Sequence, residues 1–108
     1  MSGKMSRAKG SRGELEAAKI ASEHLGLEIN RTPNSGGLWI PGDIQGIPGF
    51  HVEVKRQEKL AIDKWWEQSV QDCPENTIPI VVFRKNSQKW RVVIDYNNFL
   101  DLVKKNLV

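Results

Sequence analysis

The sequence has a single cysteine and no long hydrophobic run, and each shortage excludes a class of protein. Cys73 has no second cysteine with which to form an internal disulfide or a zinc site, which is typical of a reducing compartment. The longest hydrophobic runs, such as residues 78–83, are far shorter than a membrane span, and the first residues lack the apolar segment of a secretory signal. We therefore expect a cytoplasmic protein with no membrane partner.

Internal repeats and linker-like segments are also missing from the 108 residues. Hydrophobic residues make up 39% of the chain and charged residues 27%, which is ordinary for a soluble globular protein. The length is enough for one hydrophobic core and too short for two. We therefore expect one domain over residues 1–108.

Acidic residues are absent from the start of the chain, where Lys4, Arg7, Lys9 and Arg12 precede the first carboxylate, Glu14. The whole chain has a net charge of +3 and a pI of about 9.2. A basic and flexible arm over residues 1–11 would suit the phosphate backbone of a nucleic acid. A solvated terminus would have the same composition, so the arm alone leaves both interpretations open.

Hydrophobic periodicity and turn residues divide the chain into eight expected elements. Ser11 and Glu14 have the spacing of a capping box, which predicts a first helix from about Arg12 to Leu25. The other elements are strands near 27–30, over 38–45 and ending near 56, a helix over 61–72, strands over 78–84 and 89–94, and a last helix capped by Asp95. This order predicts an α/β fold with one mixed central sheet flanked by helices.

One stretch, PGDIQGIPGFHVEVK at residues 41–55, places charged residues on a predicted hairpin. Side chains alternate along a strand, so Glu53 and Lys55 should point to the same face. Pro48 and Gly49 suit a type II turn. A hairpin across this turn can bring Asp43 beside Glu53.

Two converging carboxylates are typical of a Mg²⁺ site, and Mn²⁺ should substitute. We expect Asp43 and Glu53 to bind the ion, with the backbone carbonyl of Val54 as a third protein ligand. Lys55 could orient the nucleophile or stabilise charge on the phosphoryl oxygens, which predicts phosphodiester hydrolysis. In the alternative interpretation, Glu53 and Lys55 form an exposed ion pair and Asp43 is only a turn residue.

The two histidines, His24 and His51, have no partners at the spacing of metal ligands. We expect His24 on a helix surface. His51 shares the predicted strand face of Glu53 and could therefore touch a substrate, but we expect it at an edge position without a chemical role.

The run GDIQGIPGFHVEVK resembles the PD-(D/E)xK nuclease signature. The expected element order is similar to the restriction-endonuclease-like α-β-β-β-α-β core of that superfamily, extended by a strand and a helix. A narrower resemblance, to archaeal-type Holliday junction resolvases and their phage relatives, is carried by Lys9-Gly10, Glu14, residues 31–36, Asp43, Glu53-Val54-Lys55 and Glu67-Gln68.

The resemblance implies that Asp43 and Glu53 bind the metal, that Lys55 is catalytic, that Glu14 adds a further carboxylate, and that Ser35 contacts the scissile region. For Glu14, a role as helix cap remains equally open.

The family usually has proline directly before the aspartate, whereas here Gly42 separates Pro41 from Asp43. We expect this departure to change the local backbone and to leave the chemistry intact.

Taken together, the resemblance implies a metal-dependent endodeoxyribonuclease, a Holliday junction resolvase that acts on branched or duplex DNA in recombination and repair. It further implies a homodimer, in the cytoplasm of a prokaryotic cell or of a phage-infected host. A restriction-like or repair nickase, and a non-catalytic DNA-binding module, remain as alternatives. The residues expected to contact DNA are Lys4, Arg7, Lys9, Arg12, Arg31, Arg56, Lys59, Lys64 and, by resemblance, Gln68.

Overall fold

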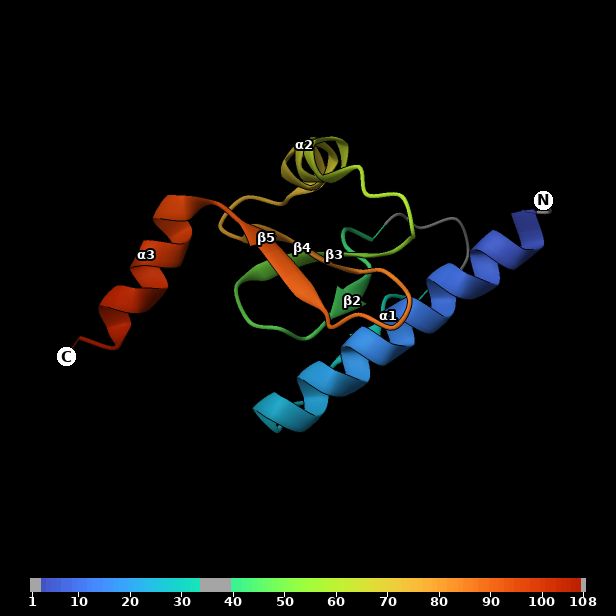
Figure 1. Ribbon diagram of the computed structural model, residues 1–108. Coiled ribbons are helices and arrows are strands. Elements are labelled where there is room, and N and C mark those ends of the chain that lie inside the picture. The colour runs from blue at the N-terminus through green and yellow to red at the C-terminus, as the bar shows by residue number, and fades with distance from the viewer. Residues whose placement is uncertain (1–2, 34–39, 108) are drawn as a thin grey trace.

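The computed structural model describes the backbone of residues 3–33 and 40–107, and the side chains from residue 10 onward within those ranges. Over these ranges, three helices and five strands follow one another in the expected order (Figure 1). They are α1 Gly3–Leu25, β1 Asn30–Arg31, β2 Ile44–Gln45, β3 Phe50–Arg56, α2 Ile62–Asp72, β4 Ile78–Arg84, β5 Arg91–Ile94 and α3 Tyr96–Lys105. In this part of the chain, each helix is too short or too polar to span a bilayer.

The sheet has the strand order β1-β2-β3-β4-β5, and it is mixed as predicted. β3 and β4 are parallel, and every other neighbouring pair is antiparallel. Parallel neighbours need a crossover connection, which α2 supplies between β3 and β4. α1 and α2 cover opposite faces of the sheet, as Figure 1 shows. The central strands β3 and β4 therefore lie in the middle of three layers.

The alternation of side chains along β3 and β4 divides the core between these two helices. Val52 and Ile80 pack with Ala17 of α1, whereas Val81 packs with Trp65 of α2. Because both faces are covered, β4 is an almost continuous hydrophobic run. Directly paired residues of neighbouring strands share a face, so the odd-numbered residues of β3 face α2.

The predicted start of the first helix, at about Arg12, is wrong. α1 begins at Gly3, so Ser11 and Glu14 lie inside the helix and form no capping box at its start. Residues 3–11, which we expected to form an arm, are its first turns. They include lysine, arginine, methionine and alanine, which are good helix formers, and no residue there requires a break.

Three strand boundaries also differ from the predicted ones. The strand expected near 27–30 forms at β1, and β5 starts at Arg91 rather than at residue 89. Of the strand expected over 38–45, only β2 is paired, and residues 38 and 39 lie outside the described part. The strand does not extend toward the N-terminus from β2, because Gly42 has a φ of 85°, which does not fit an extended strand.

A polar cluster centred on Glu16 ties α1 to the sheet. The Glu16 carboxylate accepts hydrogen bonds from Arg84 Nε at 2.8 Å and Nη2 at 3.1 Å, and from Trp90 Nε1 at 2.7 Å. The Arg84 guanidinium also lies 5.3 Å from the centroid of the Trp90 ring. Bidentate, charge-assisted bonds of this kind are among the stronger polar interactions in proteins. The hydrogen bond from Arg84 lowers the pKa of Glu16, and burial opposes this effect.

Glu16→Gln should therefore destabilise the fold by about 1 kcal/mol at pH 7, a modest figure because the Glu16 side chain is 37% exposed and water screens its charge. Since the folded-state pKa is lowered, the stabilising contribution is complete above the ordinary value of 4.5 and is lost as the pH falls through the folded value. Urea denaturation at pH 7 and pH 3 measures the difference, which should shrink at pH 3. The same change at the exposed Glu23 of α1 is the matched control and should have little effect at either pH.

Candidate active site

The turn before β3 has the predicted type II geometry. Gly49 has a φ of 82°, and Phe50 N donates a hydrogen bond to Ile47 O at 3.3 Å. β2 then pairs antiparallel with β3. Asp43 lies one residue before β2, so the hairpin carries it to the side of β3, as predicted from the sequence.

Two hydrogen bonds hold Asp43 against β3. Its amide donates to Val52 O at 2.7 Å, and its Oδ2 accepts from Val54 N at 2.7 Å. The amide and carbonyl of one strand residue point to the same edge of the strand. The Val54 carbonyl, which we expected to be a metal ligand, therefore points to the edge where Asp43 lies.

Glu53 and Lys55 both point from β3 toward α2, and the Glu53 side chain is only 15% exposed. Burial, together with the charge and hydrogen bonding of Asp43, raises the pKa of Glu53 to about 8, and the Lys55 ammonium acts in the opposite direction. A second negative charge beside Asp43 is costly in a buried position, so Glu53 retains its proton to higher pH. The structure thus brings Asp43, Glu53 and Lys55 together.

This donor set fits a divalent cation that prefers oxygen ligands. Carboxylate and carbonyl oxygens are what Mg²⁺ binds in proteins. The raised pKa of Glu53 is typical of a position where positive charge is favourable, and a bound cation would supply that charge in place of a proton. Across residues 3–33 and 40–107, no three His, Cys, Asp or Glu side chains converge to form a metal site. A metal here would therefore depend on Asp43 and Glu53, with the Val54 carbonyl beside them.

His51 was expected at an edge position, and that expectation is wrong because β3 is a central strand. The residue is 4% exposed, and its Nε2 lies 3.1 Å from Glu53 Oε1. Nε2 nevertheless has no hydrogen bond of good geometry among the described residues. Burial lowers the pKa of His51, and the charges of Asp72 and Asp43 partly oppose this. The sequence carried a signal for this contact, because side chains alternate along β3 and His51 and Glu53 therefore share a face.

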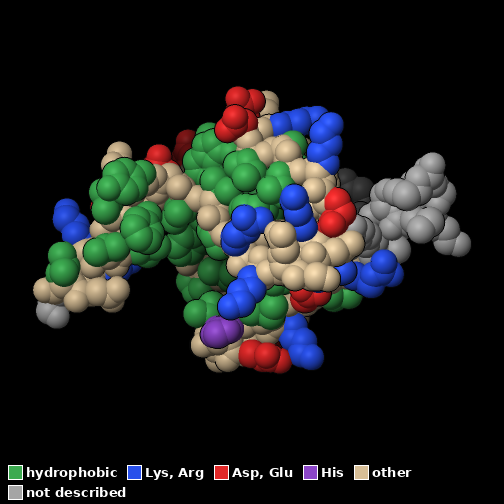
Figure 2. Space-filling model, in the orientation of Figure 1, with side chains coloured by type: hydrophobic (Ala, Val, Ile, Leu, Met, Phe, Trp, Pro, Cys, Tyr) green, Lys and Arg blue, Asp and Glu red, His purple; other side chains and the backbone are tan. Residues whose placement is uncertain are grey.

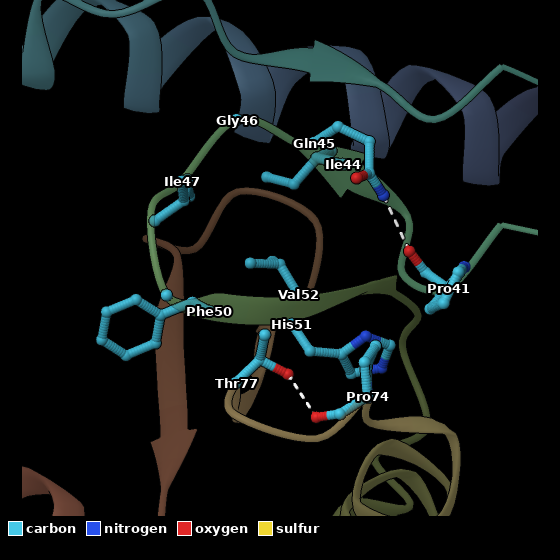
Figure 3. A pocket seen from close by; sticks show the side chains of 11 residues that line it. Pro41, Ile44, Gln45, Gly46, Ile47, Phe50, His51, Val52, Pro74 and Thr77 are labelled. Carbon is cyan, nitrogen blue, oxygen red and sulfur yellow. Dashed lines mark hydrogen bonds between the residues drawn. The ribbon is translucent and has the colours of Figure 1, made fainter.

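A cavity of about 310 Å³ borders the site at His51 (Figure 3). Its walls come from the hairpin and from the segment that follows α2. Gln45 Nε2 donates to Pro41 O at 2.7 Å on one side, and Thr77 Oγ1 donates to Pro74 O at 2.7 Å on the other. The cavity has both polar and apolar walls, and it reaches the carboxylate pair only through His51, whose Nε2 lies 3.1 Å from Glu53 Oε1.

Glu14 lies in an ion pair. Arg31 Nε donates to Glu14 Oε1 at 2.7 Å, which joins α1 to β1, and the two side chains are 38% and 18% exposed. The role of Glu14 as a cap is excluded because α1 starts well before it. Glu14 does not converge with Asp43 and Glu53 on one point among the described residues. Its role as a further metal ligand gains no support from this geometry and stays a prediction.

The remaining residues expected to contact DNA or the scissile region fall into two groups. Those on the surface of the described part are Arg12, Lys59, Lys64 and Gln68. Those outside the described residues are Ser35 and the side chains of Lys4, Arg7 and Lys9.

Arg56 is partly buried between α1 and the loop after β4. Its Nη2 donates to Asn86 Oδ1 at 3.4 Å. A Cβ added at Gly13 of α1 would lie 3.0 Å from the Cβ of Arg56, so the two segments are in close contact. Arg56 therefore contributes to packing between α1 and the sheet, and its contact with phosphate stays a prediction.

Gly42, the residue that interrupts the family pattern, allows a close approach to β3. Its φ is 85°, and a Cβ would lie 3.2 Å from Val52 O and 3.4 Å from His51 Nδ1. A glycine tolerates both the positive φ and the short distance. The chain reaches Asp43 with an unusual backbone, while the carboxylate still lies beside Glu53.

Comparisons with known proteins identify the family and the fold. The family model described as "Phage putative PDDEXK endonuclease" matches residues 5–107. Protein D14 of Escherichia phage T5 is 27% identical, in an alignment of 113 positions that covers 83% of this chain and 71% of the relative. The Holliday junction resolvase Hjc of Archaeoglobus fulgidus has a similar structure, with a TM-score of 0.55 and 22% identity over 79% of this chain and 76% of Hjc. That likeness confirms the predicted restriction-endonuclease-like fold.

Gly42→Ala should lower the free energy of unfolding by about 1–3 kcal/mol, because the new Cβ meets a carbonyl and the backbone has a positive φ. It should also displace Asp43 and abolish the effect of divalent ions on thermal stability. Gly26→Ala is the matched control, since Gly26 has a φ of 66° with open space around it. Thermal denaturation with and without Mg²⁺ compares them. The importance of the Gly42 geometry would be refuted if both variants kept the same metal response.

Proposed function

The chain belongs to the PDDEXK endonuclease family of phages, and from that premise we propose that it is a Mg²⁺-dependent endodeoxyribonuclease that resolves four-way DNA junctions. The observation that carries the proposal is the carboxylate pair. Two hydrogen bonds hold Asp43 against β3, next to Glu53, whose pKa is raised to about 8. Strongly perturbed carboxylates are typical of functional sites, because a fold without use for them has no reason to retain the repulsion.

PD-(D/E)xK nucleases use divalent metal ions, and in this chain Asp43, Glu53 and the Val54 carbonyl would hold them. When bound, such an ion lowers the pKa of the attacking water and polarises the scissile phosphate. We propose Mg²⁺ because all the donors are hard oxygens, and we expect Mn²⁺ to substitute.

Lys55 is the proposed catalytic cation. Its ammonium is close enough to Glu53 to lower the pKa of that carboxyl group. In the proposed hydrolysis, Lys55 orients the attacking water and stabilises the negative charge that builds on the phosphoryl oxygens. The water oxygen bonds to phosphorus as the bond to the leaving sugar oxygen breaks; the water gives up a proton to solvent, and the leaving oxygen takes one up.

We propose branched DNA as the substrate, cut in recombination and repair in the cytoplasm of the host cell. The likeness of fold to a Holliday junction resolvase and the phage relative support this choice. Exposed cations, among them Arg12, Lys59 and Lys64, are the proposed contacts to phosphate. Symmetric cleavage of two strands needs two active sites, so we propose a homodimer.

Asp43→Asn and Glu53→Gln should each reduce cleavage of a four-way junction in Mg²⁺ by roughly 100-fold or more, because each removes a charged metal ligand. Neither variant should melt at a lower temperature without metal, because the amide keeps the size of the side chain and removes the repulsion. Glu75→Gln, at an exposed position after α2, is the matched control and should cleave normally. Normal cleavage by Asp43→Asn or Glu53→Gln would refute the metal site.

A panel of substrates should separate junction resolution from other nuclease activities. With Mg²⁺, the wild type should cut a four-way junction at symmetric positions and spare linear duplex, and EDTA should stop the reaction. Flap and nicked substrates complete the panel. Preferential cutting of linear or nicked duplex would show a restriction-like or repair nickase instead. Metal-independent DNA binding without any cleavage would show a non-catalytic module.

A further inference from the structure

α3 is an amphipathic helix without a partner in the described part of the chain. Figure 1 shows it extending away from the sheet and from the other helices. None of its residues is buried, and Tyr96, Phe99 and Leu107 are 72%, 47% and 78% exposed. With Leu100 and Val103 they recur at helical spacing and form one apolar stripe, which is visible along α3 in Figure 2. An exposed stripe of this kind marks an interaction surface.

The helix is well defined at both ends, although it has few contacts. Asp95 Oδ1 accepts a hydrogen bond from Asn98 N at 3.1 Å, and Lys104 and Lys105 lie in the last turn. A helix of ten residues is only marginally stable in water without tertiary packing. α3 therefore requires an apolar surface to cover its stripe.

The same chain carries such a surface between α1 and β5. A groove of about 200 Å³ is lined by apolar residues, among them Ile20 of α1, Ile47 of the hairpin, and Trp90 and Val92 at β5. Ile20 is 39% exposed and Val92 is 54% exposed, so the groove is open to solvent. We name it the α1–β5 groove.

α3 is poorly placed to fill the groove of its own chain. Only Asp95 separates Ile94, the end of β5, from Tyr96, the start of α3. Connections that fold a helix back over the strand it follows have two or more residues. Asp95 is the N-cap, with a ψ of 136°, and α3 extends away from the sheet after it (Figure 1). The occupant of the groove must come from elsewhere.

We infer that two copies of this chain exchange their C-terminal helices, with α3 of each copy docked in the α1–β5 groove of the other. The exchange covers both apolar surfaces of both chains at once. It closes with two-fold symmetry, because each copy offers the same helix and the same groove. It also specifies how the homodimer of the proposed function, on which it partly rests, would be built.

The exchange leaves the candidate active site uncovered. Val92 pairs with Val82, and both line the groove on the α1 side of the sheet. Glu53 and Lys55 point to the opposite side, toward α2. A DNA substrate and the second copy would therefore use different faces of each subunit.

A charge swap tests the inference without DNA or metal. The wild type should have the mass of a dimer by light scattering at micromolar concentration. Leu100→Lys in α3 and Ile20→Glu in the groove should each give monomers, because a charge then enters an apolar contact. An equimolar mixture should recover the dimer, since the introduced lysine meets the introduced glutamate at one contact and the other contact is wild type.

Leu15→Glu is the matched control, because Leu15 is 56% exposed and lies on the side of α1 away from Ile20. It should remain a dimer. A wild type that is monomeric throughout would overturn the inference. So would a mixture that stays monomeric, or a dimer that survives Ile20→Glu and is lost only with Leu100→Lys, which would indicate pairing of α3 with α3.

If a charged variant fails to fold, cysteine cross-linking keeps the inference testable. The double variant Ile20→Cys with Leu100→Cys, in a Cys73→Ser background, should form a product of twice the mass on a non-reducing gel. A disulfide formed only within one chain would overturn the exchange. Cleavage assays on the same proteins are a separate readout. If the wild type is a dimer but cleaves no DNA, the result counts against the proposed function and not against the helix exchange.

Discussion

The site depends on how Asp43 is held against β3. Its backbone amide and its carboxylate both bond to that strand, at Val52 and Val54. These two bonds fix the carboxylate beside Glu53, although the two acidic groups repel each other. Burial strengthens this repulsion and raises the pKa of Glu53 to about 8. The hairpin therefore holds two carboxyl groups together, and at neutral pH both can be charged only if a cation binds between them.

The sheet separates the two carboxyl groups from the interactions that stabilise the fold. On the α1 side, small and aliphatic residues pack closely, and Glu16 ties the helix to Arg84 and Trp90. On the α2 side, Glu53 and Lys55 project from the middle of the sheet, and His51, which points to the same side, lines the neighbouring cavity. Central strands are the most rigid part of such a fold, which suits a site that must keep two carboxylates in place.

Much of the site was predictable because its residues are close in sequence. A turn residue with positive φ and a side-chain period of two are local properties, and they sufficed to place Asp43 beside Glu53 with Lys55 on the same face. The start of α1 was not predictable from a capping pattern, because Ser-x-x-Glu also fits a helix interior. Glu14 forms an ion pair with Arg31, seventeen positions along the chain, and no local sequence pattern predicts that pair.

The sequence by itself determined the order of the elements, the mixed α/β class and the hairpin with its charged residues, because these follow from periodicity and turn chemistry within short segments. Tertiary structure alone decided which groups are buried. It showed His51 inside a central strand against Glu53, Gly42 close to β3, and α3 without a covering surface among the described residues. The reason is that burial and long-range contact depend on which elements meet in space, and a residue's neighbours in sequence do not encode that.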